Sequence, residues 1–249
     1  MFTSLMRAQF SLAWVIGPPI AFAVAIAYGF RYLYLGAAIA FLACCLVVGF
    51  RLPNSPRRNS VASPALRAWQ NPDVRLLIIG STLMWTCNSM YIIDMPLYIS
   101  HTLQLKEKWA GIMMGTAACL EIPAMLISSY YTRHYGKKVM MLSAAVAGLL
   151  FYGGLLWFET PVGLIGIQLF NAIFIGILAS IGMCYFQDLL SHAPGGATTL
   201  YSNTIKTGAI IGGAISGVVA QWFGYHAVFE VSLLLIAASL LCFYKVDHS

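Results

Sequence analysis

Long apolar segments alternate with short polar segments along almost the whole chain. Eight such segments lie at about residues 8–27, 31–50, 75–99, 109–131, 138–158, 161–188, 199–222 and 226–245. About 20 apolar residues are enough to cross a bilayer as a helix, and Leu76 to Ile93 alone gives 18 residues without a charge. The pattern predicts an all-α membrane protein with about eight transmembrane helices.

Composition supports a membrane protein. Hydrophobic residues make up 60% of the chain, charged residues make up 9%, and the mean hydropathy is +0.80. A soluble chain of this length could not keep so much apolar surface from water. The net charge of +6 does not indicate nucleic-acid binding, because the basic residues flank apolar segments and form no patch that would follow a phosphate backbone.

Basic residues gather in alternate gaps between the apolar segments. Ten lie on one side (Arg7, five arginines at 51–75, three residues at 132–138, and Lys245), and three lie on the other (Arg31, Lys106 and Lys108). The side richer in Lys and Arg is normally cytoplasmic. We therefore expect a multi-pass protein of the bacterial inner membrane with both termini of this chain in the cytoplasm.

One gap is longer than the others. Residues 51–74 contain four prolines and four arginines, which is typical of a polar linker between two membrane units. The predicted organisation is two transmembrane helices at 1–50, a basic cytoplasmic linker at 51–74, and six helices at 75–249.

Two short motifs carry a family resemblance. Gly17-Pro18-Pro19 follows Arg7 in the first apolar segment, and the turn from Ser129 to Lys138 contains Gly136, Lys137 and Lys138. Both resemble the major facilitator superfamily, in the fifth helix and in the loop between helices eight and nine. Ser129 stands for the first Gly of that loop pattern and Arg133 for its Asp. Residues 10–19 are most similar to bacterial sugar efflux transporters.

The resemblance implies a fold and a mechanism. Members have twelve helices in two halves of six, so this chain is expected to correspond to helices five to twelve, as an N-terminally truncated or mis-started product. Such proteins are secondary transporters that bind substrate between the halves. The resemblance implies proton-coupled efflux of sugars or glycosides, or of drug-like amphipathic molecules. A non-transporting product or a membrane interaction subunit is the alternative.

Two carboxyl groups lie inside predicted helices. Glu121 is 13 residues into its segment, near mid-membrane at about 1.5 Å per residue. Asp94 lies just before Pro96, close to the predicted extracytoplasmic end, where partial hydration is expected. Intramembrane carboxyl groups indicate function by default, so both are candidate proton-coupling residues. A structural hydrogen bond between helices is the alternative for Glu121, and a helix-end role is the alternative for Asp94.

Candidate substrate-binding residues are polar or aromatic side chains within the segments. Amides and aromatic faces suit sugars, but the same groups also join helices. Gln168 and Asn171 share a helix face because they are three residues apart. The charge of Lys206 either reaches the membrane surface or pairs with a carboxylate. The candidates are Trp85, Asn88, Tyr91, Gln168, Asn171 and Lys206.

Several glycines and prolines predict structural roles. Small residues four apart let helix backbones approach closely, and Pro bends a helix. By the resemblance, the glycine-rich face of the seventh segment packs on a helix absent here, so we expect it to face lipid or a partner chain. The structural candidates are Gly17, Pro18, Pro19, Gly136, Lys137, Lys138, Gly208, Gly212, Gly213 and Gly217.

Other chemistry is not indicated. The histidines have no metal-ligand spacing, and no phosphate-binding loop or catalytic constellation is present. We therefore expect no metal, no cofactor and no enzymatic activity. The predicted partners are membrane lipid and a small-molecule sugar, and the sequence leaves the oligomeric state open.

Overall fold

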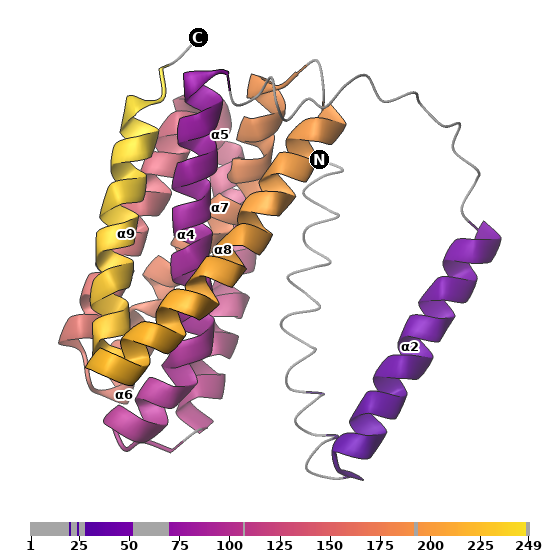
Figure 1. Cartoon of the computed structure of the whole chain (residues 1–249), viewed down its shortest axis with the longest axis vertical. Helices are drawn as coiled ribbons and strands as arrows, with labels where there is room; N and C mark the ends of the chain where they lie inside the picture. Colours follow the sequence, from indigo (N-terminus) through magenta and orange to yellow (C-terminus); the bar gives the residue numbers. More distant parts are fainter. Residues whose placement is uncertain are drawn as a thin grey trace. The chain divides into compact units, whose positions relative to one another are not determined.

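The computed structural model describes residues 20, 24, 28–51, 70–106, 108–191 and 194–247. Throughout these residues the regular structure is helical (Figure 1). The chain divides into two compact units, one of which covers residues 5–62; each is described by itself. The helices are α2 (Phe30–Arg51), α4 (Pro72–Leu97), the π-helix η1 (Tyr98–Thr102), α5 (Lys108–Trp157), α6 (Pro161–Gly166), α7 (Gln168–Leu189), α8 (Pro194–Phe223) and α9 (Tyr225–Lys245).

Helix α2 is a single apolar helix of 22 residues. Its large side chains are exposed, for example Phe41 at 74% and Phe50 at 84%, as expected of a helix that lies in lipid. The motif Gly17-Pro18-Pro19 lies outside the described residues, as do most of the preceding predicted helix at 8–27 and most of the 51–74 linker.

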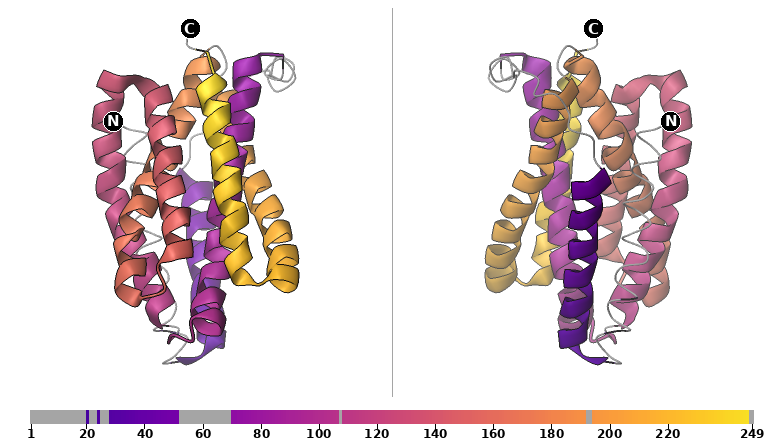
Figure 2. Two further views of the ribbon diagram at one scale, coloured as in Figure 1. Left: turned by 90° about the vertical axis from the view of Figure 1, so that its left-hand side faces the viewer. Right: turned by 90° about the vertical axis from the view of Figure 1, so that its right-hand side faces the viewer.

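Helix α4 lies at the centre of the larger unit. It packs against α8, α9, α5 and α7, and Figure 1 shows it between α8 and α9 with α5 and α7 behind. Its first turn is capped by Asn71, whose side chain accepts a hydrogen bond from the backbone N–H of Asp73. Figure 2 shows α8 and α9 joined by a tight turn, where Gly224 has φ of 86°, a value that favours glycine.

Helix α5 contains two of the predicted transmembrane segments. Its 50 residues are interrupted at Gly136, where φ is 81° and ψ is 164°. This backbone geometry is accessible mainly to glycine, and it separates the predicted helices at 109–131 and 138–158. Gly136 therefore reverses the chain between them.

Five helices in the described residues are long and apolar enough to cross a membrane. They are α2, α4 with η1, α5, α6 with α7, and α9. Helix α8, predicted at 199–222, is 30 residues long but falls outside this set, because polar residues such as Asn203, Lys206 and Thr207 lower its hydropathy. The described helices establish an all-α fold with several membrane-spanning helices.

The glycines of α8 differ from the expectation. A Cβ atom on Gly208 would lie 2.7 Å from Cβ of Trp85, and one on Gly212 would lie 2.8 Å from the carbonyl oxygen of Thr86. Both glycines thus face α4 within the unit, and the prediction that this face meets lipid or a partner chain was wrong for them. Among the described residues, a Cβ atom on Gly213 would contact only Ile93, at 3.8 Å, and one on Gly217 would have nothing within 4 Å.

Candidate functional site

Three predicted substrate-binding residues meet in the interior of the larger unit. Tyr91 on α4 donates a hydrogen bond from its hydroxyl to Oε1 of Gln168 on α7, at 3.2 Å. Asn171, one turn along α7, donates from Nδ2 to the same oxygen, also at 3.2 Å. All three side chains are at most 4% exposed. They therefore join α4 to α7 by hydrogen bonds inside the packed bundle.

Tyr152 adds a fourth polar group to this interior cluster. The ring of Phe151 lies 5.1 Å from the ring of Tyr91 and 5.0 Å from the ring of Tyr152. The Tyr152 hydroxyl and Oδ1 of Asn171 are buried and have no hydrogen-bond partner among the described residues. Tyr152 was not among the sequence candidates, because nothing in its local pattern distinguishes it from an aromatic core residue.

Asp94 is more buried than its position near a helix end suggested. It is 2% exposed, and its Oδ2 accepts a hydrogen bond from the hydroxyl of Ser216 on α8. The expectation of partial hydration was therefore wrong. Asp94 lies just before Pro96 and the π-helix η1, and π-helical turns often occur at functional sites. Its carboxyl group ties α4 to α8 in an apolar environment.

Glu121 occupies the first half of α5 and is only partly buried. Its backbone lies close to α7, because a Cβ atom on Gly176 would be 3.3 Å from the Glu121 carbonyl oxygen. Its carboxylate makes no ion pair or hydrogen bond with the described residues. A partly exposed carboxylate at mid-membrane depth can exchange protons or contact a ligand.

The remaining candidates line the surface of α4 and α8. Trp85 is half-buried and its ring meets that of Tyr201 edge-on, with centroids 6.5 Å apart; its Nε1 has no partner among the described residues. Asn88 is half-buried and Lys206 is exposed. Lys206 forms no ion pair within the described part of the chain. The structure does not bring Lys206, Asp94 and Glu121 together.

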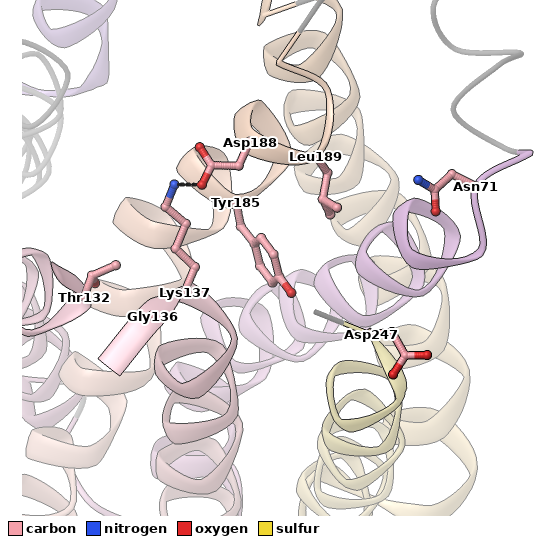
Figure 3. Close-up of a pocket in the computed structure, with 8 residues that line it drawn as sticks. All are labelled: Asn71, Thr132, Gly136, Lys137, Tyr185, Asp188, Leu189 and Asp247. Atoms are coloured by element: carbon pink, nitrogen blue, oxygen red, sulfur yellow. Dashed lines mark hydrogen bonds and ion pairs between the residues drawn. The ribbon is translucent and has the colours of Figure 1, made fainter. Parts of the chain in front are cut away.

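The two lysines after Gly136 contact the ends of two other helices. Lys137 forms an ion pair with Asp188 near the end of α7 (Figure 3), with side-chain exposures of 25% and 62%. Lys138 donates to the carbonyl oxygen of Val246, at 2.5 Å. Cations near a helix C-terminus interact favourably with its dipole. The acidic partner that this loop lacks, because Arg133 stands in place of Asp, is thus supplied by α7.

The distribution of acidic residues in the sequence marked the end of the bundle where the Gly136 turn lies. Of the eight acidic residues, only three lie on the same predicted side as the Gly136 turn, namely Asp73, Asp188 and Asp247. All three are found here, because Asp188 and Asp247 line one pocket and Asp73 accepts a hydrogen bond from the backbone N–H of Asp247, at 3.0 Å.

Comparison with known proteins shows extensive similarity. The family model of the Major Facilitator Superfamily matches residues 1–167. The chain is 50% identical to "Sugar efflux transporter B" of Salmonella typhimurium, over 99% of this chain and 63% of that protein. It is 51% identical to "Sugar efflux transporter A" of Escherichia coli, over 99% of this chain and 64% of that protein. It is 28% identical to "Multi-drug resistance efflux pump PmrA" of Streptococcus pneumoniae, over 72% of this chain and 46% of that protein. The chain therefore spans less than two thirds of the length of these relatives.

Proposed function

Because the chain belongs to the major facilitator superfamily, we propose that it acts in the secondary active export of sugars or glycosides, in exchange for protons, across the inner membrane. This proposal rests on one observation: over 99% of the chain, about half of all residues are identical to those of relatives named as sugar efflux transporters. Those names describe transporters and not enzymes. The basic residues at alternate ends of the helices support a cytoplasmic location for both ends of this chain.

The polar groups of the bundle suggest a division of roles. Glu121 is our first candidate for the proton carrier, because its carboxylate is partly exposed and unpaired among the described residues. Asp94 is the second, because it is buried and already bonded to Ser216. Asn88 and Trp85 are accessible enough to contact a substrate, and Lys206 is exposed on α8.

Tyr91, Gln168 and Asn171 are assigned a supporting role at this site. Their side chains are buried and satisfy one another in part, so they position α4 against α7 next to the accessible residues. Gly136, Lys137 and Lys138 fix the chain reversal between the two segments of α5. Gly208 and Gly212 of α8 allow close approach to α4.

Efflux from loaded cells tests the proposal. Cells that express the chain are loaded with a labelled, non-metabolisable glycoside, and the label retained is followed after dilution. We expect faster loss than in vector controls when the chain is part of the full-length fusion described below, and no faster loss from the chain alone; Glu121→Gln in the fusion should abolish the difference. Glu159→Gln, at an exposed position, is the matched control and should leave efflux unchanged. Normal efflux by the Glu121 variant would remove that carboxylate from the mechanism.

The length of the chain requires a second arm in the same assay. A fusion supplies the part of the Escherichia coli relative that lies outside the match, so that the fused protein has that relative's full length. Efflux by the fusion but not by the chain alone would assign transport to the longer protein. Absence of efflux in both, at equal membrane abundance, would favour the alternative of a non-transporting membrane subunit.

A second substrate class has its own support. The chain is 28% identical to a protein named as a multi-drug resistance efflux pump, so amphipathic drug-like molecules are the alternative cargo. The same cells loaded with an amphipathic dye distinguish the two classes. Export of the dye without export of the glycoside would replace sugars by drug-like substrates.

A further inference from the structure

A polar cavity opens where four helices of the larger unit end or turn. It has a volume of about 510 Å³ and is lined from the start of α4, the Gly136 turn of α5, the end of α7 and the residues after α9. Figure 3 shows Tyr185 and Leu189 of α7 between Lys137 on one side and Asn71 on the other. None of these lining residues belongs to the transport site proposed above, apart from Gly136 and Lys137 in their structural role.

The Tyr185 hydroxyl is the unexplained feature of this cavity. The side chain is 6% exposed, and its hydroxyl has no hydrogen-bond partner among the described residues. Buried polar atoms in folded proteins are almost always hydrogen-bonded. Tyr185 lines the cavity, and Figure 3 shows its hydroxyl directed toward the side where Asp247 lies, so a molecule in that cavity can supply the missing partner.

The other polar groups that line the cavity can still donate and accept hydrogen bonds. The Asn71 amide oxygen is used by the N–H of Asp73, at 2.9 Å, and its amide N–H groups have no partner within the described part of the chain. The Thr132 hydroxyl donates to the carbonyl oxygen of Ser128, at 2.6 Å, so it can still accept. The carboxylate of Asp247 is exposed and makes no bond with the described residues. Donors and acceptors therefore alternate around one space.

The charges of the wall disfavour an anion and permit a neutral ligand. Lys137 is neutralised by Asp188, and Asp247 adds one further negative charge. A phosphate would meet two carboxylates, whereas hydroxyl groups can donate to them without bringing a charge, and the competition described below separates such a ligand from a cation. A polyhydroxyl molecule can donate to the carboxylates and accept from amide N–H groups, and its apolar face can lie on the Tyr185 ring and Leu189.

We propose that this cavity binds a neutral polyhydroxyl molecule of the sugar class, with the Tyr185 hydroxyl as its buried anchor. The transport role of the site rests on the proposed function: it is where an exported sugar first binds on the Lys- and Arg-rich side of the membrane. Binding itself does not depend on that role, so the two can fail separately.

Titration of the purified full chain with a methyl hexoside tests the proposal, with ligand-detected saturation-transfer NMR as the readout. Tyr185→Phe keeps the ring and removes one hydrogen bond, which should weaken binding about three- to tenfold. Asp247→Asn should weaken it as well, and this residue lies at an exposed edge where packing is not disturbed. Circular dichroism confirms that each variant stays helical.

Tyr225→Phe is the matched control. It also removes a tyrosine hydroxyl, but at the first residue of α9, which is 20 residues before the end of that helix at Lys245, or about 30 Å at 1.5 Å per residue. It should leave hexoside affinity unchanged. Equal loss in this variant and in Tyr185→Phe would overturn the assignment, as would no binding by the unaltered chain.

Competition with inorganic phosphate and with tetramethylammonium separates the ligand classes. Neither ion should displace the hexoside. If phosphate or tetramethylammonium displaces it at a concentration lower than that of the hexoside, the cavity binds ligands of that ion's charge instead. If the cells export the glycoside but Tyr185→Phe leaves hexoside binding unchanged, the cavity site is refuted and the transport function is not. Hexoside binding that Tyr185→Phe weakens, in a chain without efflux activity in either arm, would refute the transport function alone.

Discussion

Replacing Gly208 by Ala tests the close contact of α8 with α4. The new Cβ atom would lie 2.7 Å from Cβ of Trp85 and 2.9 Å from the backbone nitrogen of Thr86. Carbon atoms in contact prefer a separation of about 3.5–4.0 Å. The two helix backbones approach here without an intervening side chain, so relief requires the helices to move apart.

Two opposing free-energy terms set the magnitude. Overpacking of a well-packed contact typically costs about 1–3 kcal/mol, whereas Ala in place of Gly inside a helix stabilises by about 1 kcal/mol. Gly208→Ala should therefore lower the free energy of unfolding by about 1 kcal/mol net. At Gly217, where a Cβ atom meets nothing within 4 Å among the residues that the structure describes, only the favourable term applies, and the same substitution should raise stability by about 1 kcal/mol.

Thermal unfolding of the two purified variants in one detergent provides the measurement. A difference of about 2 kcal/mol corresponds to about 4–8 °C in the unfolding midpoint for a chain of this size. Gly213→Ala, with one contact at 3.8 Å, should resemble Gly217→Ala. If Gly208→Ala is as stable as Gly217→Ala, the glycine does not mediate a close helix contact, and the packing argument fails.

Two further predictions concern buried polar side chains. Ser216→Ala should destabilise the chain by about 1–3 kcal/mol, because it removes the bonded partner of the buried Asp94 carboxyl. Asp94→Asn keeps an acceptor and should cost less stability. Thermal unfolding ranks the two variants, and the reverse order would contradict the contact between Ser216 and Asp94. Tyr201→Phe should lower the free energy of unfolding by about 1 kcal/mol, because the Tyr201 hydroxyl donates at 2.7 Å to a backbone carbonyl of α7. Tyr152→Phe removes a hydroxyl that has no partner among the described residues, so it should be neutral or stabilising. An equal loss of stability in both variants would show that the Tyr152 hydroxyl is hydrogen-bonded.

Helix positions were accessible from the sequence because lipid imposes a length and a composition on each segment. The predicted segments at 31–50 and 226–245 coincide within one residue with α2 and α9. The reversal at Gly136 was also predictable, since glycine and two lysines between apolar segments mark a polar turn. Helix α8 was predicted as a span although its polar residues leave it below the hydropathy of the other helices.

Contacts between helices could not be derived in the same way. Asp94 stood out because a carboxyl group is rare in an apolar segment, but its partner Ser216 is 122 residues away and resembles any other serine. The face of Gly208 was assigned wrongly because four-residue spacing identifies a close contact without identifying the helix on the other side. Tyr185 gave no signal, since its missing partner is visible only once four helix ends are brought together.

The polar contacts of α4 constrain how this helix can move. Its Gly80 carbonyl accepts a hydrogen bond from α9, at 2.9 Å, its Tyr91 hydroxyl donates to α7, and its Asp94 carboxyl accepts from α8. The three contacts join α4 to three different helices, so rotation of α4 about its own axis would break them together and leave buried polar groups unpaired. We therefore expect α4 to move with α7, α8 and α9 as one body, as the rocking motion of the proposed transport mechanism would require.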